Sequence, residues 1–199
     1  MANEFVMRDG RTIIKTVIID KYESTVTDNC WNLFLQECET VIGFDTEWSY
    51  LPTGKDDKIE TRIVLLRFCS RTSCLIVKLT DDHRVLEKLG SFLCNKDIVF
   101  AGVHIQKDLD KLQKQYGFEV RNFMDLSQLA VVRDKYKFRL SLCGVREVAS
   151  NVFSDYGMQP RLGFMPVRFS TGTQVENAAA DPEDAYDAYR IAKYYLIDA

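Results

Sequence analysis

The sequence has few of the residues that build structural zinc sites. It contains two histidines, and none of its six cysteines stands in a Cys-x-x-Cys pair. Structural zinc is normally held by such pairs together with histidine, so we expect no zinc site. The cysteines are scattered, and most lie in apolar contexts, which is typical of small core residues. Unpaired cysteines of this kind favour a reducing compartment, the cytoplasm or the nucleus.

Two further absences narrow the function. No apolar run approaches the roughly 20 residues of a membrane-spanning helix, and the first ten residues lack the apolar core of a signal peptide, so we expect no membrane partner. The formal net charge is −3, which leaves no general basic character. Attraction to nucleic acid would therefore need a local basic patch or a bound metal ion. The 199 residues, 46% of them hydrophobic, contain no repeat or linker and predict one globular domain over 1–199.

One apolar segment that ends in acids stands out, V-I-G-F-D-T-E-W at 41–48. Its short apolar run predicts a buried strand. Side chains two residues apart share one face of a strand, so Asp45 and Glu47 should point the same way. Two adjacent carboxylates repel unless a cation lies between them, and Mg²⁺ or Mn²⁺ would satisfy both. The alternative from these residues alone is a strand that ends in a loop with two solvated acids.

The rest of the chain changes from strands to alternating helices and strands. We expect strands at 11–20, 63–69 and 73–79, with an exposed polar loop at 49–61. Thr25 or Thr27 is the expected cap of the helix that follows the first strand. After these strands we expect a helix that starts at Asp81 or Asp82, helices at 104–116, 122–134 and 141–153, and a last helix that starts at Asp181. Strands are expected between them at 98–103 and near 119–120, and an irregular crossing is expected at 156–173. This order predicts an α/β fold with a mixed sheet, antiparallel at first and then parallel, flanked by helices.

Further acids occur where a strand leads into a helix and where the last helix begins. Asp108 lies near the start of the helix at 104–116, next to its apolar stripe, and Asp110 should face solvent. The last helix opens with Asp181, Asp184 and Asp187 in D-P-E-D-A-Y-D. Acids at helix starts also simply favour the helix dipole, and that alternative remains open for both groups.

Three segments in this order resemble the motifs of the DEDD superfamily of 3′–5′ exonucleases. They are F-D-T-E-W, G-V-H-I-Q-K-D-L-D-K-L and E-D-A-Y-D-A-Y-R-I-A-K. Within this superfamily the chain resembles the Werner-syndrome-type exonuclease domain and its small plant relatives. D-L-S-Q-L-A and S-L-C-G-V also fall where that family has helices. The resemblance covers nearly the whole chain and implies a ribonuclease H-like fold.

The resemblance also implies a chemistry and its residues. Family members use four acids to hold two divalent ions, Mg²⁺ or Mn²⁺, which activate water and stabilise the leaving 3′ oxygen. Asp45 and Glu47 match the first motif, Asp108 matches the second, and Asp184 is the favoured match to the third. Trp48, beside the acids, is a candidate for stacking on a terminal base, and core packing is the alternative. The other candidate substrate-binding residues are His104 and Lys107.

The third motif departs from the family pattern, which reads Tyr-x-x-x-Asp in one subfamily and uses a histidine in another. No histidine follows His104. Three residues compete as the third-motif acid, and each puts a different residue where the tyrosine should be. Asp184 puts Ala180 there, Asp181 puts Asn177 there, and Asp187 puts Glu183 there. None restores the tyrosine. The side chain that orients the attacking water is therefore missing, unless a neighbouring subunit supplies it.

Two functions follow from this departure. The first is a metal-dependent 3′–5′ exonuclease that removes nucleotides from single-stranded RNA or DNA. The second is a catalytically weakened or inactive exonuclease-fold protein that binds nucleic acid or protein. Lysines 107, 111 and 114, and separately Arg133, Lys135, Lys137 and Arg139, form basic clusters that would suit phosphates. A small domain of this kind would also suit a homo-oligomer.

Overall fold

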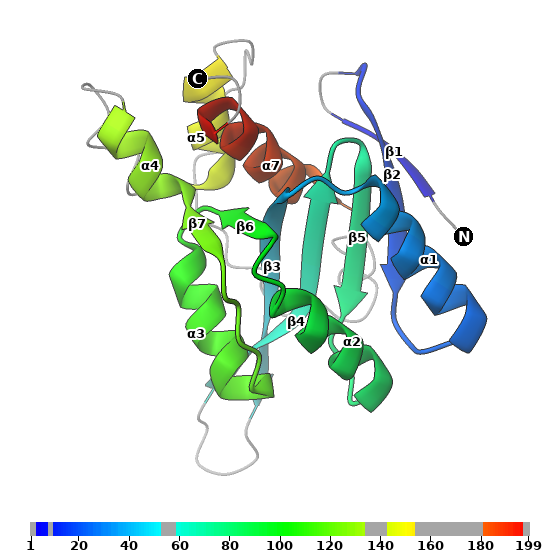
Figure 1. Cartoon of the computed structure of the whole chain (residues 1–199). Helices are drawn as coiled ribbons and strands as arrows, with labels where there is room; N and C mark the ends of the chain where they lie inside the picture. Colours follow the sequence, from blue (N-terminus) through cyan, green and yellow to red (C-terminus); the bar gives the residue numbers. More distant parts are fainter. Residues whose placement is uncertain (1–2, 8–9, 53–58, 134–142, 154–180, 197–199) are drawn as a thin grey trace.

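The computed structural model describes residues 3–7, 10–52, 59–133, 143–153 and 181–196. Seven strands form one mixed sheet in the order β1-β2-β5-β4-β3-β6-β7 (Figure 1). The strands are β1 Asn3–Val6, β2 Ile13–Ile19, β3 Val41–Pro52, β4 Ile59–Ser70, β5 Ser73–Lys78, β6 Val99–Gly102 and β7 Phe123–Asp125. The helices are α1 Ser24–Glu37, α2 His83–Leu93, α3 Ile105–Tyr116, α4 Leu126–Arg133, α5 Val145–Phe153 and α7 Glu183–Leu196. Within these described residues, no helix combines the length and apolar character needed to cross a membrane.

The centre of the sheet is the antiparallel meander β3-β4-β5 that the sequence predicts. β6 then pairs with β3 in parallel, and β7 pairs with β6 in parallel. At the other edge, β2 runs parallel to β5, and β1 runs antiparallel to β2. The expected combination of an antiparallel part followed by parallel strands is therefore present, with helices on both faces.

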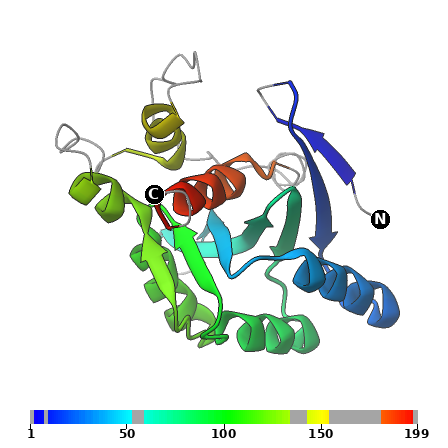
Figure 2. The same cartoon turned by 45° about the horizontal axis from the view of Figure 1, so that its top comes forward.

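The two faces of the sheet carry different helices. On one face, alternate residues of the central strands pack against α1, α2 and α3 in the largest apolar cluster. This cluster contains edge-to-face aromatic contacts. The ring centroids of Phe68 and Phe92 are 5.1 Å apart, and those of Phe92 and Phe100 are 5.2 Å apart. On the other face, α7 packs on β3, and α5 packs against α7. Figure 2 shows α5 and α7 on one side of the sheet and α1 and α2 on the other.

Local sequence signals place several helix ends correctly. Asp82 caps α2, since its side chain accepts the Arg84 amide hydrogen. Gly117 ends α3 in a left-handed conformation with φ of 72°, which glycine adopts without steric cost. Asp181 accepts the amide hydrogen of Glu183 at the start of α7, as the D-P-E-D sequence predicts. The helix ends that frame the sheet are therefore fixed by short-range chemistry.

Other predictions are wrong in their details. β3 and β4 extend into 49–61, because they pair as far as Pro52 opposite Ile59, where a loop was expected. The strand expected near 119–120 lies at 123–125, where it gains β6 as a partner, and α4 starts after it. The first helix begins at Ser24, and Thr27 instead accepts the amide hydrogen of Glu23 from within the helix. The crossing at 156–173 lies outside the described residues.

Gly43 sets how closely α7 lies on the sheet. A Cβ atom at this position would stand 1.9 Å from the Ala185 carbonyl oxygen and 2.4 Å from the Tyr189 amide nitrogen. Both are backbone atoms of α7, so neither can move aside as a side chain can. The missing side chain in β3 therefore brings the first two turns of α7 directly over the strand that carries Asp45 and Glu47.

Replacing Gly43 with alanine should force α7 away from β3. We expect Gly43→Ala to lower the free energy of unfolding by about 3 kcal/mol or more, because the backbone has to shift to relieve the overlap. Gly90→Ala in α2 is the matched control. Its added Cβ would meet only Phe118 at an ordinary 3.5 Å, and alanine favours a helix. Urea denaturation should show a large loss for the first variant and none for the second. Equal stability of both would refute the proposed role of Gly43.

Candidate functional site

Asp45 and Glu47 point to the α7 face of the sheet, where they share one partner. Arg67 lies on β4 directly opposite Asp45 and on the same face. Its Nη1 atom donates to Asp45 Oδ2 at 2.6 Å, and its Nη2 atom donates to Glu47 Oε1 at 2.9 Å. One guanidinium therefore bridges both acids of the first motif. The cation that the adjacent carboxylates require is a side chain of the protein.

This pair of bonds lies at the boundary between the interior and solvent. The Arg67 side chain is 3% exposed, while Asp45 and Glu47 are 26% and 29% exposed. Burial by itself lowers the pKa of Arg67, but the two carboxylates outweigh it and hold the pKa above its ordinary value. Burial raises the pKa of Asp45 to about 7, the charges of Asp184 and Glu47 add to this, and Arg67 opposes it. Arg67 thus stays charged beneath its two partners.

The acids at the start of α7 have their own arginine. Arg146 of α5 donates from Nε to Asp184 Oδ1, and its Nη2 atom lies 3.6 Å from Asp181 and 3.8 Å from Glu183. Burial lowers the pKa of Arg146, and the neighbouring carboxylates raise it to a net value above the ordinary one. Asp184 is also near enough to Asp45 to raise its pKa. The charge of Asp184 therefore reaches Asp45, while its assignment as the third-motif acid stays a prediction.

Asp187 is buried one turn further along α7. Its side chain is 4% exposed, and its Oδ1 atom lies 3.9 Å from Arg190 Nη1 without a hydrogen bond to any described residue. Burial raises the pKa of Asp187 to about 7, with contributions in the same direction from Asp184 and Glu183. Arg190 and Arg146 act against this rise. Asp187 is thus an acid whose ionisation the fold disfavours.

Asp108 contacts the opposite face of β3. It accepts hydrogen bonds from the Thr46 hydroxyl at 2.8 Å and from the Trp48 indole nitrogen at 2.9 Å. Thr46 alternates with Asp45 and Glu47 along the strand, so its side chain lies on the α3 side of the sheet. Burial raises the pKa of Asp108, although both hydrogen bonds lower it. In this arrangement Asp108 is a partner of Thr46 and Trp48, and its predicted metal role stays a prediction.

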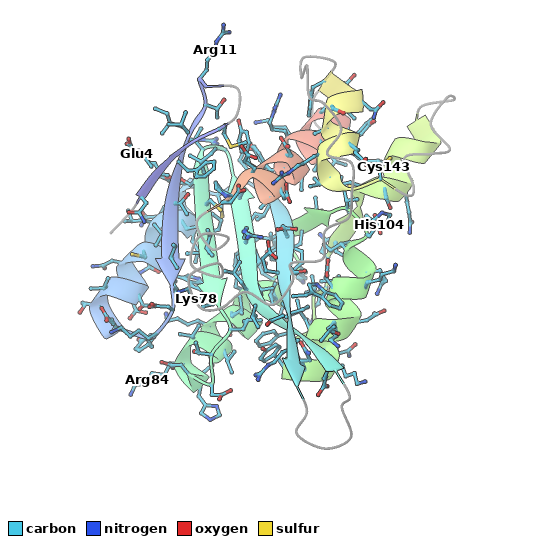
Figure 3. The ribbon with its side chains drawn as sticks, turned by 180° about the vertical axis from the view of Figure 1, so that it is seen from behind. Glu4, Arg11, Lys78, Arg84, His104 and Cys143 are labelled. Atoms are coloured by element: carbon cyan, nitrogen blue, oxygen red, sulfur yellow. The ribbon has the colours of Figure 1, made fainter. Side chains whose placement is uncertain are left out.

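The three predicted substrate-binding residues differ in their surroundings. The Trp48 ring packs on the core and has the Lys111 ammonium 5.5 Å from its centroid. The His104 amide donates to Asp125, and the His104 Nε2 atom lies 3.1 Å from the Cys143 carbonyl oxygen. Figure 3 labels His104 and Cys143, which lie near each other. Both side chains therefore have structural partners. Lys107 is exposed on α3 and faces solvent.

The acids as arranged do not suit a divalent metal ion. Among the described residues, no three His, Cys, Asp or Glu side chains come together in a group that could hold a metal. The two acids that share a face are already bridged by a guanidinium. Two unit charges 4 Å apart interact by about 4 kcal/mol near a protein surface, so a divalent ion at that distance from Arg67 would be repelled by about twice as much. The donor set does not fit a divalent ion while Arg67 is in place.

Sequence reasoning missed the two arginines that hold these acids. Arg67 is the one charged residue of the apolar strand I-V-L-L-R-F-C, and a charge in a buried strand needs a partner. That signal was available in the sequence. Arg146 carries no comparable signal, because V-R-E-V-A is an ordinary amphipathic helix pattern. Its role depends on how α5 packs against α7.

The buried Asp187 should make stability depend on pH. Its folded pKa is about 7, above the ordinary value near 4, so the folded state retains a proton that the unfolded chain releases. Its contribution is thus fully present below pH 4 and is lost as the pH rises to about 7. We expect Asp187→Asn to be more stable than the wild type at pH 8, by about 2–4 kcal/mol, and to match it near pH 4.

Thermal denaturation from pH 4 to pH 8 would measure this dependence. Asp110→Asn is the matched control, because Asp110 is exposed on α3 and contacts only Gln106 among the hydrogen bonds described. The control should follow the wild-type curve at every pH. An Asp187→Asn curve parallel to the wild-type curve would show that Asp187 is ionised in the folded state.

Comparisons with known proteins agree with the geometry of the fold. A family model described as 3′–5′ exonuclease matches residues 20–143. An Arabidopsis thaliana protein, RISC-interacting clearing 3′–5′ exoribonuclease 1, is 26% identical over 152 residues, which are 75% of this chain and 72% of that protein. The bifunctional 3′–5′ exonuclease/ATP-dependent helicase WRN of Mus musculus is 30% identical over 106 residues, 53% of this chain and 7% of that much longer protein.

Solved structures show the same architecture. Escherichia coli RNase D has a TM-score of 0.62 at 15% identity, with 92% of this chain and 44% of that chain covered. Brucella melitensis NrnC bound to pGG has a TM-score of 0.60 at 12% identity, with 92% and 82% covered. The expected ribonuclease H-like fold is confirmed by these likenesses and by the mixed sheet. The family model covers residues 20–143, which include the first and second motifs, and the chain belongs to the 3′–5′ exonuclease family.

Proposed function

We propose that this protein binds single-stranded nucleic acid through an exonuclease fold in which metal-dependent hydrolysis is largely lost. The observation that carries the proposal is the buried Arg67 guanidinium, which bridges Asp45 and Glu47. Arg146, which is 26% exposed, pairs with Asp184. Three of the four acids predicted to act in hydrolysis, Asp45, Glu47 and Asp184, are thereby paired with arginines. The missing third-motif tyrosine supports the same conclusion, because the side chain that orients water is not present at any of the three alignments.

The surface proposed for binding is the lysine face of α3, formed by Lys107, Lys111 and Lys114. These residues are four and three positions apart, so they lie on one side of the helix. Lys107 and Lys114 are exposed, and Lys111 extends over Trp48 and donates to Thr61. Ammonium groups spaced along one helix suit the phosphates of a single strand. The second basic cluster, from Arg133 to Arg139, falls where the structure gives no side-chain description.

RNA is the first nucleic acid to test. The Arabidopsis relative carries the word exoribonuclease in its name, and its match covers most of both chains. DNA remains the comparison substrate, since the mouse relative is named more broadly as an exonuclease.

A second candidate is a metal-dependent 3′–5′ exonuclease, which family membership favours. It requires Mg²⁺ or Mn²⁺ at Asp45, Glu47, Asp108 and Asp184. Asp45 and Glu47 do share the face on which Asp184 approaches, which supports this candidate. However, Arg67 would have to leave both carboxylates, and Asp108 would have to leave Thr46 and Trp48.

Nuclease and binding assays on one preparation would separate the two candidates. The substrate is a 5′-labelled single-stranded 20-mer, as RNA and as DNA, incubated with Mg²⁺ and then with Mn²⁺. We expect shortening at least 100-fold slower than that by the Arabidopsis relative, because Arg67 balances the acids. Fluorescence anisotropy with EDTA should still show binding, and Asp45→Asn should bind as the wild type does. Stepwise wild-type shortening that Asp45→Asn abolishes would instead establish the metal-dependent exonuclease.

Charge reversal on α3 tests the binding surface. We expect Lys107→Glu to weaken single-strand binding about tenfold at low salt and to reduce the slope of affinity against salt concentration, because one phosphate contact is lost. Lys15→Glu is the matched control, since Lys15 is also exposed but lies on β2, whereas α3 packs against β3, β4 and β7. Anisotropy titrations from 50 to 200 mM salt measure both. Equal weakening by the two variants would mean that only net charge matters.

A further inference from the structure

Arg67 has three properties that a bridging cation between two carboxylates needs. It stands opposite Asp45 in the β3–β4 register, so the backbone fixes its position. Its fork reaches one oxygen of each acid, at 2.6 Å and 2.9 Å. It is also more deeply buried than either acid. A buried arginine also cannot lose its charge to ease its burial, because the guanidinium stays protonated at ordinary pH.

We propose that Arg67 is a resident cation that replaces the divalent metal of the family at Asp45 and Glu47, and that these acids form a latent metal site which opens when the arginine charge is removed. This inference deepens the proposed function and rests on it. It adds that a single residue, Arg67, causes the loss of metal binding and of the chemistry that depends on the metal. The two carboxylates, their strand and the approach of Asp184 are retained.

The charges around Asp45 and Glu47 explain why Arg67 alone is sufficient to exclude a divalent ion. Asp45 and Glu47 together carry two negative charges when ionised, and Arg67 supplies one positive charge between them. Without the guanidinium, two carboxylates on one face of β3 would repel each other, and Asp184 would add to the repulsion. Such a group relaxes either by taking up protons or by binding a cation. Hard carboxylate oxygens favour Mg²⁺ and Mn²⁺ among the common cations.

Divalent-ion binding by Arg67→Gln is the test, since glutamine removes the charge and keeps a hydrogen-bonding side chain of similar length. We expect 5 mM Mn²⁺ to raise the melting temperature of Arg67→Gln by about 5 °C relative to EDTA, and that of the wild type by less than about 1 °C. Titration followed by the electron paramagnetic resonance of free Mn²⁺ should show bound ion for the variant only. Adding Asp45→Asn to Arg67→Gln should remove the binding.

Two matched controls isolate the charge at position 67. Arg67→Lys keeps the positive charge with a shorter side chain, and we expect it to remain insensitive to Mn²⁺. Arg71→Gln loses an arginine charge on the same hairpin, where Arg71 is exposed and pairs with Glu39, and it should also remain insensitive. A Mn²⁺ response in Arg71→Gln equal to that in Arg67→Gln would overturn the proposal, because overall charge would then explain the binding.

The wild type decides the matter if Arg67→Gln does not fold. Wild-type Mn²⁺ binding that Asp45→Asn abolishes would overturn the proposal, and its absence at 5 mM supports the resident cation. A folded Arg67→Gln that binds no Mn²⁺ would overturn the latent site. These outcomes differ from a failure of the proposed function, which would appear as rapid wild-type hydrolysis or as no binding of single strands. Wild-type metal binding without hydrolysis would overturn this inference alone.

Discussion

The ion pairs from Arg67 to Asp45 and Glu47 are the interaction on which the site depends. A charge as buried as Arg67 is stable only with close partners, and removing one partner of a buried pair typically costs about 3–5 kcal/mol. Its bonds require β3 and β4 to keep the register that sets Asp45 opposite Arg67. Two residues before Asp45 and on the same face of β3, Gly43 lets α7 approach the strand closely. Register, helix approach and charge pairing are therefore linked.

Alternation along β3 divides the acids between two environments. Asp45 and Glu47 face α7 and are paired with an arginine, whereas Thr46 lies on the other face and holds Asp108 through its hydroxyl. A strand cannot offer both of its faces to one site, so Asp108 would need to leave Thr46 to join the first-motif acids. The motif order of the family is thus retained in sequence, while the described contacts give its acids separate partners.

Local signals predicted much of this fold, and long-range pairing decided the rest. The caps at Asp82 and Asp181 and the end of α3 at Gly117 depend on neighbouring residues, so short patterns were sufficient. The extension of β3 and β4 into a polar stretch depends on each strand finding the other, which composition does not reveal. The shared face of Asp45 and Glu47 followed from strand period alone.

The cation between Asp45 and Glu47 is another feature that local sequence patterns could not identify. The repulsion between Asp45 and Glu47 correctly required a positive partner, but the pattern could not say whether it is a metal or a side chain. Arg67 lies twenty residues or more along the chain, and only the β3–β4 register shows that it stands opposite Asp45. The sequence signal for this role was a charged residue within an apolar strand, which needs a charged partner.

The relative depth of these charges also bears on where a nucleic acid can contact the protein. A phosphate that approached the α7 face would meet the carboxylates first, because Asp45 and Glu47 are more exposed than the guanidinium beneath them. Metal ions would reverse that potential, but a single buried arginine only balances part of it. Phosphates should therefore be drawn to exposed ammonium groups, such as Lys107 and Lys114 on α3. Under the proposed function, the lysine face of α3 and the acids on β3 are then separate surfaces, and a strand would be held without its terminal phosphodiester reaching the acids.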